Sequence, residues 1–437
     1  SGSAYDDDDD DALDAEDADD VVPVASRLGA MQHGLGTGAW LAGDVTAPPS
    51  APLVPTFDRD GVRTGLGVAL ETDDDGANAP FVASVVTPEA RVVSEETRAA
   101  STSSSEKPRV SSSWGSIAFR EVVTAAGTYR FRVRDSKTAT KTENKEKPAV
   151  LFLHGFMGGM EDWDAVARGL CAEARCVAAD MPGHGGTTFA PGAGFAEADG
   201  YAVEAMAEAT TKLGDALFGG GGDDAAPVTV VGYSMGARVA LAAAAAAPSF
   251  LETKRGGGVV SIGGSPGIAG AEARRARAER DDALADALRA AGVASFARAW
   301  YQQGLFGSLT AHPRYSAARL ASRRARDAER GDDANESGAA ARLAATLSAA
   351  SPGRQARVDA QSLVESGVRV DFVTGELDAK FVKIAETLAE EMRAFGRKSG
   401  REARVYESAV PGAGHAAHLE APETLVLRLL RIVRAET

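Results

Sequence analysis

Two apolar patterns follow one another along the chain. Residues 117–123 and 129–134 alternate apolar and polar positions on either side of Gly127, which predicts an antiparallel hairpin. Beyond it, short continuous apolar runs alternate with helix-forming stretches, a pattern typical of a mostly parallel sheet with helices on both faces. The predicted strands of this sheet cover residues 149–153, 176–179, 228–231, 259–262, 368–373 and 403–406. The pattern therefore predicts an α/β fold with a doubly wound sheet.

The strands stop between residues 267 and 357, where helix-forming sequence rich in Arg and Ala intervenes. We expect residues 267–357 to be a helical lid inserted before the last strands, between a first core part at 111–266 and a second at 358–437. Residues 1–110 are rich in Asp, Ala, Thr, Ser and Pro and are expected to be an acidic, largely disordered linker. Within it, residues 28–46 are less biased in composition and are interpreted as a remnant of a preceding domain.

Negative charge is concentrated at the start of the chain. The sequence holds 62 Asp and Glu against 47 Lys and Arg, for a net charge of −15. Residues 1–20 contribute eleven acids and no base, so the remainder carries only −4. No broad basic face is expected, which argues against nucleic acid as a partner. No run of 18 apolar residues occurs, so no membrane span is expected.

The two cysteines predict neither a disulfide nor a metal site. Cys171 and Cys176 lie five positions apart and are expected to be free thiols in a reducing compartment. No further Cys, His or carboxylate ligands cluster beside them in the sequence, so no metal is expected. No cofactor is expected either.

A nucleophile motif follows the predicted strand at residues 228–231. Residues 232–236 (GYSMG) match the G-x-S-x-G pattern and precede a helix-forming run, which makes Ser234 the candidate nucleophile. Gly232 and Gly236 are needed because such a turn brings the strand and the helix close together. The alternative interpretation is an ordinary strand-to-helix turn.

A second motif, HGFMGG at residues 154–159, follows the first parallel strand. This position provides one oxyanion-hole donor, which we expect to be the backbone N–H of Phe156. The backbone N–H of Met235, at the start of the helix after the nucleophile, is expected to be the other. His154 is interpreted as holding this turn by hydrogen bonds, with direct proton transfer as the alternative.

The acid and the histidine of a triad should follow Ser234 in that order. Asp378 lies on a turn just past a predicted strand, whereas Asp371 lies inside that strand and is the weaker choice. His415 lies in a Gly-rich loop, whereas His418 begins the run into the last helix, as a packing or capping residue would. We expect His415 to activate Ser234 and Asp378 to fix the imidazole tautomer.

Over residues 115–435 the chain resembles 2-succinyl-6-hydroxy-2,4-cyclohexadiene-1-carboxylate synthase of menaquinone and phylloquinone biosynthesis. The resemblance includes the lid, which varies most among α/β hydrolases. The segments that carry it are residues 154–159, 232–238, 263–267, 300–303, 306, 353–355, 375–381 and 413–415. The resemblance implies an α/β-hydrolase fold, and therefore a mostly parallel, doubly wound sheet with a helical lid.

Residues 33–41 resemble the end of the o-succinylbenzoate synthase module of the plant and algal phylloquinone fusion enzyme. This second resemblance implies that the chain is the C-terminal α/β-hydrolase part of such a fusion. Its partners would then be upstream modules of the same polypeptide. A soluble protein of the plastid is implied, with the cytoplasm as the alternative location.

The reaction implied by the first resemblance is loss of pyruvate from a small polycarboxylate, an enolpyruvyl succinyl-cyclohexene carboxylate, with the triad as base. The residues expected to bind this substrate are His154, Tyr233, Arg238, Arg277, Trp300, Phe306, Arg323 and Lys380. Arg238 lies one helical turn after Ser234 and so shares its face of the helix. For Arg277 and Arg323 in the lid, a solvated helix face is the alternative.

Two other functions compete with this interpretation. A carboxylesterase or C–C bond hydrolase would share the triad and differ only in the lid. A catalytically silent receptor or interaction module of the same fold would use the acidic tail as its contact surface. Dehalogenase and epoxide-hydrolase chemistry is disfavoured, because those enzymes need an aspartate where this chain has Ser234.

Overall fold

The computed structural model of the chain describes residues 53–57, 63–68, 114–137, 147–219, 226–246, 249–251, 257–329 and 336–434. Within the segment expected to be a linker, β1 (Leu53–Phe57) and β2 (Arg63–Val68) form an antiparallel pair that the sequence analysis did not predict. The remnant expected at residues 28–46 lies outside the described residues.

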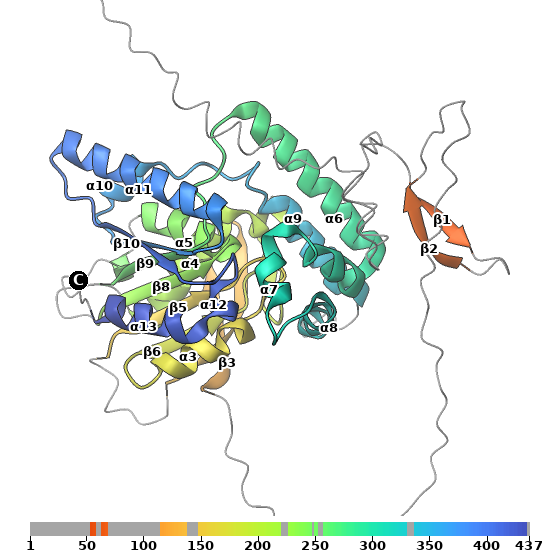
Figure 1. The fold of residues 1–437 in the computed structure, drawn as a ribbon, viewed down its shortest axis with the longest axis horizontal. Helices are drawn as coiled ribbons and strands as arrows, with labels where there is room; N and C mark the ends of the chain where they lie inside the picture. The colour runs from red at the N-terminus through yellow and green to blue at the C-terminus, as the bar shows by residue number, and fades with distance from the viewer. Residues whose placement is uncertain are drawn as a thin grey trace, which may run out of the picture.

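A nine-stranded sheet forms the centre of the molecule, with the strand order β11-β10-β9-β8-β5-β6-β4-β3 and with β7 (Thr188–Pro191) paired to β4 (Figure 1). The hairpin predicted around Gly127 is present as β3 (Ser116–Val123) and β4 (Gly127–Asp135). The strands that pair in parallel are β5 (Ala149–Leu153), β6 (Arg175–Ala179), β8 (Val228–Tyr233), β9 (Gly258–Ile262), β10 (Val370–Gly375) and β11 (Val405–Val410). The predicted mostly parallel sheet is confirmed.

Helices cover both faces of this sheet, because its central strands are apolar on both sides. On one face, Val150 and Phe152 pack with α3 (Asp164–Leu170), the short α12 (Ala417–Glu420) and α13 (Pro422–Val433). On the other face, Leu151 and Leu153 pack with α4 (Val203–Phe218), α5 (Met235–Ala245), α10 (Ala360–Glu365) and α11 (Ala379–Ser399). All residues of β5 and β8 are buried, as continuous apolar runs predict.

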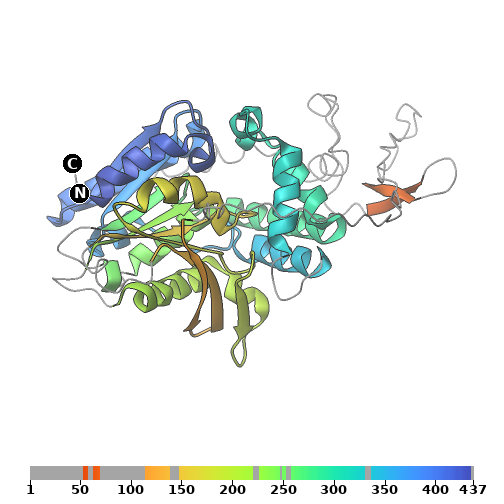
Figure 2. The ribbon, with the colours of Figure 1, turned by 90° about the horizontal axis from the view of Figure 1, so that it is seen from below.

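A helical insertion separates β9 from β10, within the boundaries 267–357 expected for a lid. Its helices are α6 (Ala271–Trp300), α7 (Gly307–Ala311), α8 (Ala317–Ala328) and α9 (Glu336–Ala349). A break at Gly292, whose φ is 74°, divides α6. The insertion lies beyond one end of the sheet in both views (Figures 1 and 2).

Two strand predictions are displaced, and one strand of the central sheet was missed. β10 and β11 each begin two residues later than expected, at Val370 and Val405, because the parallel register pairs these two residues with each other. β7 was not predicted. Its four residues join the sheet only at the edge of β4, so they carry little apolar pattern. No helix in the described part of the chain has the length and hydrophobicity needed to cross a membrane.

Candidate active site

The ends of the parallel strands bring the predicted catalytic residues to one edge of the sheet. β8 leads directly into Ser234, β10 leads into Asp378 and β11 leads into His415. β5 leads into the loop at residues 154–159, which reaches the same edge. Residues far apart in the sequence therefore meet at one place.

Ser234 stands on a strained turn between β8 and α5. Its φ is 50° and its ψ is −110°, a left-handed conformation that costs an ordinary residue free energy. Backbone segments lie very close together at this turn. A Cβ atom at Gly232 would lie 2.3 Å from the Gly236 carbonyl oxygen, and one at Gly236 would lie 2.4 Å from the Leu153 carbonyl oxygen. Both glycines of the motif are thus required by the turn that presents the serine.

His415 joins the serine to the acid. Its Nδ1 lies 2.7 Å from Oδ2 of Asp378, and its Nε2 lies 3.2 Å from Oγ of Ser234. Both His415 and Asp378 are buried. With Nδ1 donating to the carboxylate, Nε2 is left to accept the serine proton. Gly263, whose φ is 56°, makes room for the imidazole, because a Cβ there would lie 2.9 Å from the His415 Cε1 atom.

Asp371 and His418, the weaker candidates for the acid and the base, make other contacts. The Asp371 carboxylate accepts a hydrogen bond of 2.7 Å from Arg369, two positions away in the chain. The His418 ring packs against Trp163 and Tyr233, with ring centroids 4.8 and 4.2 Å apart. His418 is therefore a packing residue, as expected.

Most N–H groups of the loop after β5 and of the residue that follows it donate within the core. That of Met157 donates to Nε2 of His184, that of Gly158 to the Gly155 carbonyl, that of Gly159 to Asp162 and that of Met160 to Asp180. Among the described residues, the N–H groups of Phe156 and Met235 donate to no acceptor of the protein. Met235 is the first residue of α5, where the helix dipole favours negative charge.

The expected substrate contact of His154 needs correction. Its ring is fully buried, Nε2 accepts the Met181 N–H at 2.9 Å, and Nδ1 donates to the Gly155 carbonyl at 2.8 Å. Burial lowers the pKa of His154, so the ring is neutral and holds the loop by its two hydrogen bonds. Neither nitrogen is available to a substrate. Tyr233 is also largely buried, with its ring between His415 and His418.

Two of the predicted arginines lie on α5 and on α6 of the insertion. Arg238 is mostly buried and donates to Oε1 of Gln355 at 2.8 Å. Burial and the nearby charge of Arg277 lower the pKa of Arg238 to about 10. Arg277 is itself paired with Asp281, its Nε lying 2.9 Å from Oδ2. Arg238 and Arg277 are therefore near enough for their charges to interact.

Other predicted binding residues lie around the edge of the sheet that carries the triad. Trp300 packs on Phe156 with ring centroids 5.2 Å apart, and Phe306 lies 6.1 Å from the His415 ring. These two aromatic rings form an apolar wall that joins the insertion to the loop and the triad. Lys380 is exposed on the first turn of α11.

Arg323 does not point freely into the site, because its guanidinium pairs with Asp162 at 2.8 Å and with Asp327 at 3.5 Å. The neighbouring Arg324 is buried on the same Asp162 carboxylate. Asp162 and Arg324 were not predicted from the sequence. The only signal was an acid in the first turn of the 3₁₀ helix η2 (Met160–Trp163), close after the loop.

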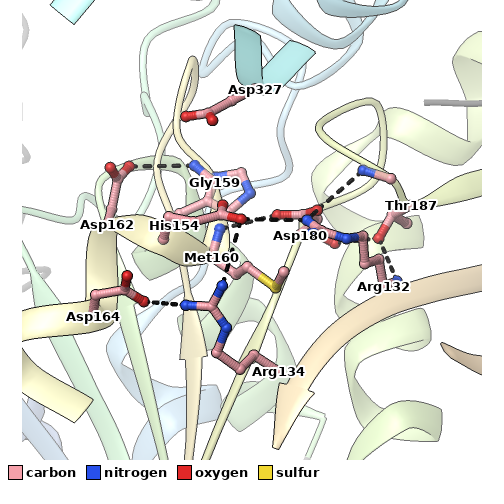
Figure 3. A network of polar contacts seen from close by, with 12 residues as sticks. Arg132, Arg134, His154, Gly159, Met160, Asp162, Asp164, Asp180, Thr187 and Asp327 are labelled. Atoms are coloured by element: carbon pink, nitrogen blue, oxygen red, sulfur yellow. Dashed lines mark hydrogen bonds and ion pairs between the residues drawn. The ribbon is translucent and has the colours of Figure 1, made fainter. Parts of the chain in front are cut away.

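Figure 3 shows the polar network beneath this loop. Asp180, at the end of β6, accepts the N–H of Met160 at 2.9 Å and an Arg132 guanidinium hydrogen bond at 2.9 Å. Arg134 pairs with Asp164 beside it. The buried Asp180 thus ties the end of the loop to β4, and the partly buried Arg134–Asp164 pair ties β4 to α3. In the described part of the chain, no group of three or more His, Cys, Asp or Glu side chains could hold a metal ion.

Comparisons with known proteins agree with this architecture. The model of the alpha/beta hydrolase family matches residues 150–428, and the fold and the Ser-His-Asp arrangement define a protein of that class. Protein PHYLLO, chloroplastic, from Arabidopsis thaliana is 34% identical over 295 residues, which are 67% of this chain and 16% of that protein. The chain thus spans about a sixth of the length of that relative.

The shorter bacterial relatives match along nearly their whole length. The 2-succinyl-6-hydroxy-2,4-cyclohexadiene-1-carboxylate synthase of a Klebsiella pneumoniae strain is 33% identical over 288 residues, which are 65% of this chain and 94% of that protein. The chain belongs to this synthase family within the alpha/beta hydrolases. Among solved structures, MenH from S. aureus has a TM-score of 0.54 at 21% identity, covering 72% of this chain and 99% of the other, which supports the fold.

Proposed function

We propose that the chain eliminates pyruvate from 2-succinyl-5-enolpyruvyl-6-hydroxy-3-cyclohexene-1-carboxylate and releases 2-succinyl-6-hydroxy-2,4-cyclohexadiene-1-carboxylate. It would act as a carbon-oxygen lyase of menaquinone and phylloquinone biosynthesis. The observation that carries the proposal is the Ser234–His415–Asp378 arrangement in a chain 33% identical to a synthase of that product over 94% of its length.

In the proposed mechanism, Ser234 Oγ removes the ring proton next to the succinyl carbonyl as His415 Nε2 takes the serine proton. The electron pair of the broken C2–H bond forms C2=C3, the ring double bond moves to C4=C5, and the C5–O bond to the enolpyruvyl group breaks. The released enolate takes a proton at its methylene carbon and becomes pyruvate. Asp378 orients the imidazole and stabilises its positive charge.

We assign the N–H groups of Phe156 and Met235 to the oxygen that becomes negative when the proton leaves. Two N–H donors at fixed positions in a water-poor site stabilise such an oxyanion at little reorganisation cost. The carboxylates of the substrate would pair with Arg238 and Arg277, with Arg323 and Lys380 as further cations. Trp300 and Phe306 would enclose the ring.

We also propose that the insertion at residues 267–357 acts as a lid over this edge of the sheet. Residues 1–110 would be a linker, and upstream modules of the same polypeptide would be its partners. The chloroplastic Arabidopsis relative supports a plastid location.

Pyruvate release tests the proposal. The full chain is given the enolpyruvyl substrate, and pyruvate is followed by coupling to lactate dehydrogenase, with p-nitrophenyl acetate hydrolysis measured in parallel. We expect fast pyruvate release and slow ester cleavage. We expect Ser234→Ala to lower pyruvate release by about 10³-fold or more while the circular dichroism spectrum is unchanged. Fast ester cleavage without pyruvate release would instead indicate an esterase, and neither reaction a silent module.

A further inference from the structure

Asp162 faces two parts of the molecule with its two carboxylate oxygens. Oδ2 accepts the backbone N–H of Gly159, in the loop after β5, at 3.3 Å (Figure 3). Oδ1 forms an ion pair with Arg323 at 2.8 Å and accepts a hydrogen bond from Arg324 at 2.9 Å, and both arginines lie on α8 of the insertion. The side chain is 2% exposed. One buried carboxylate therefore touches the core loop and the insertion at once.

The two arginines hold this carboxylate differently. Arg324 is buried and its Nε donates to the Tyr301 hydroxyl at 2.8 Å, so it also joins α8 to the end of α6. Arg323 is 26% exposed and shares its charge with Asp327. Burial alone would raise the pKa of Asp162, but Arg324 and Arg323 hold it well below its usual range. Asp162 is thus a permanent anion, and Arg324 is its fixed partner.

The other polar ties of the loop run to the core. The N–H groups of Met157 and Met160 donate to His184 and Asp180, which lie on the connection after β6. The Gly159 N–H, in contrast, donates to Asp162, and Asp162 is bound in turn by an arginine of α8. A shift of α8 would therefore act on the backbone three residues after Phe156, whose N–H is assigned to the oxyanion. Sub-ångström changes in such a donor are enough to cost transition-state stabilisation.

We propose that Asp162 is a positioning residue for the reaction, holding the loop of N–H donors with one carboxylate oxygen and the insertion with the other. The position of the insertion and the position of the Phe156 N–H then both depend on Asp162. This inference rests on the proposed function for its substrate, but its geometry concerns the oxyanion donors whatever the substrate is.

Asp162→Asn tests this with Asp135→Asn as the matched control. Asp135 is also a buried carboxylate paired with an arginine at 2.7 Å, but this partner, Arg175, begins β6 at the end away from the site. Four quantities are measured at a temperature where each variant is fully folded. They are kcat and KM for pyruvate release, the rate at which a fluorophosphonate labels Ser234, and amide hydrogen exchange of residues 317–328.

We expect Asp162→Asn to lower kcat and the labelling rate at least tenfold, to change KM less, and to speed exchange in α8. Asp162→Glu, which keeps the charge, should recover more than half of the lost activity on a logarithmic scale. Asp135→Asn should change only the melting temperature. If Asp162→Asn does not fold, Arg324→Lys, which keeps the charge but cannot bridge Asp162 and Tyr301, is measured in the same way and should show the same losses.

A melting temperature that falls while kcat and labelling stay within twofold would overturn the inference and leave a purely structural ion pair. The labelling rate separates this failure from failure of the proposed function. A wild-type chain that releases no pyruvate but labels Ser234 tenfold faster than Asp162→Asn would retain the inference and reject the substrate.

Discussion

Two aspartates that sit on or just after the same strand differ in what their carboxylates touch. Asp378 lies 2.7 Å from Nδ1 of His415, whereas Asp371 is paired with Arg369. We expect Asp378→Asn to lower kcat for pyruvate release by about 10³- to 10⁴-fold, because an amide cannot hold the required imidazole tautomer. Asp371→Asn is the control and should keep kcat within about twofold. Equal losses in the two variants would contradict the triad.

We expect His418 to make the free energy of unfolding depend on pH in the acidic range. Burial, more than any other effect, lowers its pKa from 6.5 to about 3, and both ring nitrogens lack a hydrogen-bond partner in the described residues. Between these two pKa values the unfolded chain binds a proton that the folded chain does not, so the free energy of unfolding falls as the pH drops below 6.5.

His418→Phe should remove this contribution and keep the contacts with Trp163 and Tyr233. We expect the loss of unfolding free energy between pH 7 and pH 5 to be smaller by about 2 kcal/mol in the variant. Urea denaturation at the two pH values measures it. His154 and His184, whose pKa values are also lowered by burial, keep titrating in both proteins. Identical pH dependence in variant and wild type would show that His418 is not the source.

At the scale of elements, the parallel strands and the helical insertion could be predicted because each carries its own local pattern. Continuous apolar runs mark β5, β8 and β9, which are buried on both faces. Strand ends were less predictable. β10 and β11 begin where each finds the other as a partner, and that register is a tertiary property.

The same division applies to the site. Ser234, Asp378 and His415 could be proposed from a motif and a fixed chain order, and the structure brings them within hydrogen-bonding reach. The ion pair between Asp162 and Arg324 joins residues 162 positions apart, in a segment with several neighbouring arginines. No local pattern says which arginine turns inward, so the pair could not be predicted.

At the scale of the whole molecule, the sheet divides the apolar core into two clusters, and both are built from residues 114–433. The buried apolar residues of the insertion helices α6, α7, α8 and α9 belong to only one of them, the cluster that also contains Phe152, Trp163 and Leu425. The insertion helices therefore pack on the same face of the sheet as α3 and α13, whereas α4, α5 and α11 pack on the opposite face.

The location of both clusters in the sequence predicts the effect of removing residues 1–110. Both core clusters and all three residues of the Ser234–His415–Asp378 arrangement lie after that segment. We expect residues 111–437 to melt within about 2 °C of the full chain and to keep kcat within about twofold. Scanning calorimetry and pyruvate release measure this, and a variant lacking only residues 1–20 separates the effect of eleven acidic charges from that of the rest. A large loss of melting temperature on the longer deletion alone would mean that residues 21–110 pack on the hydrolase fold and are part of it.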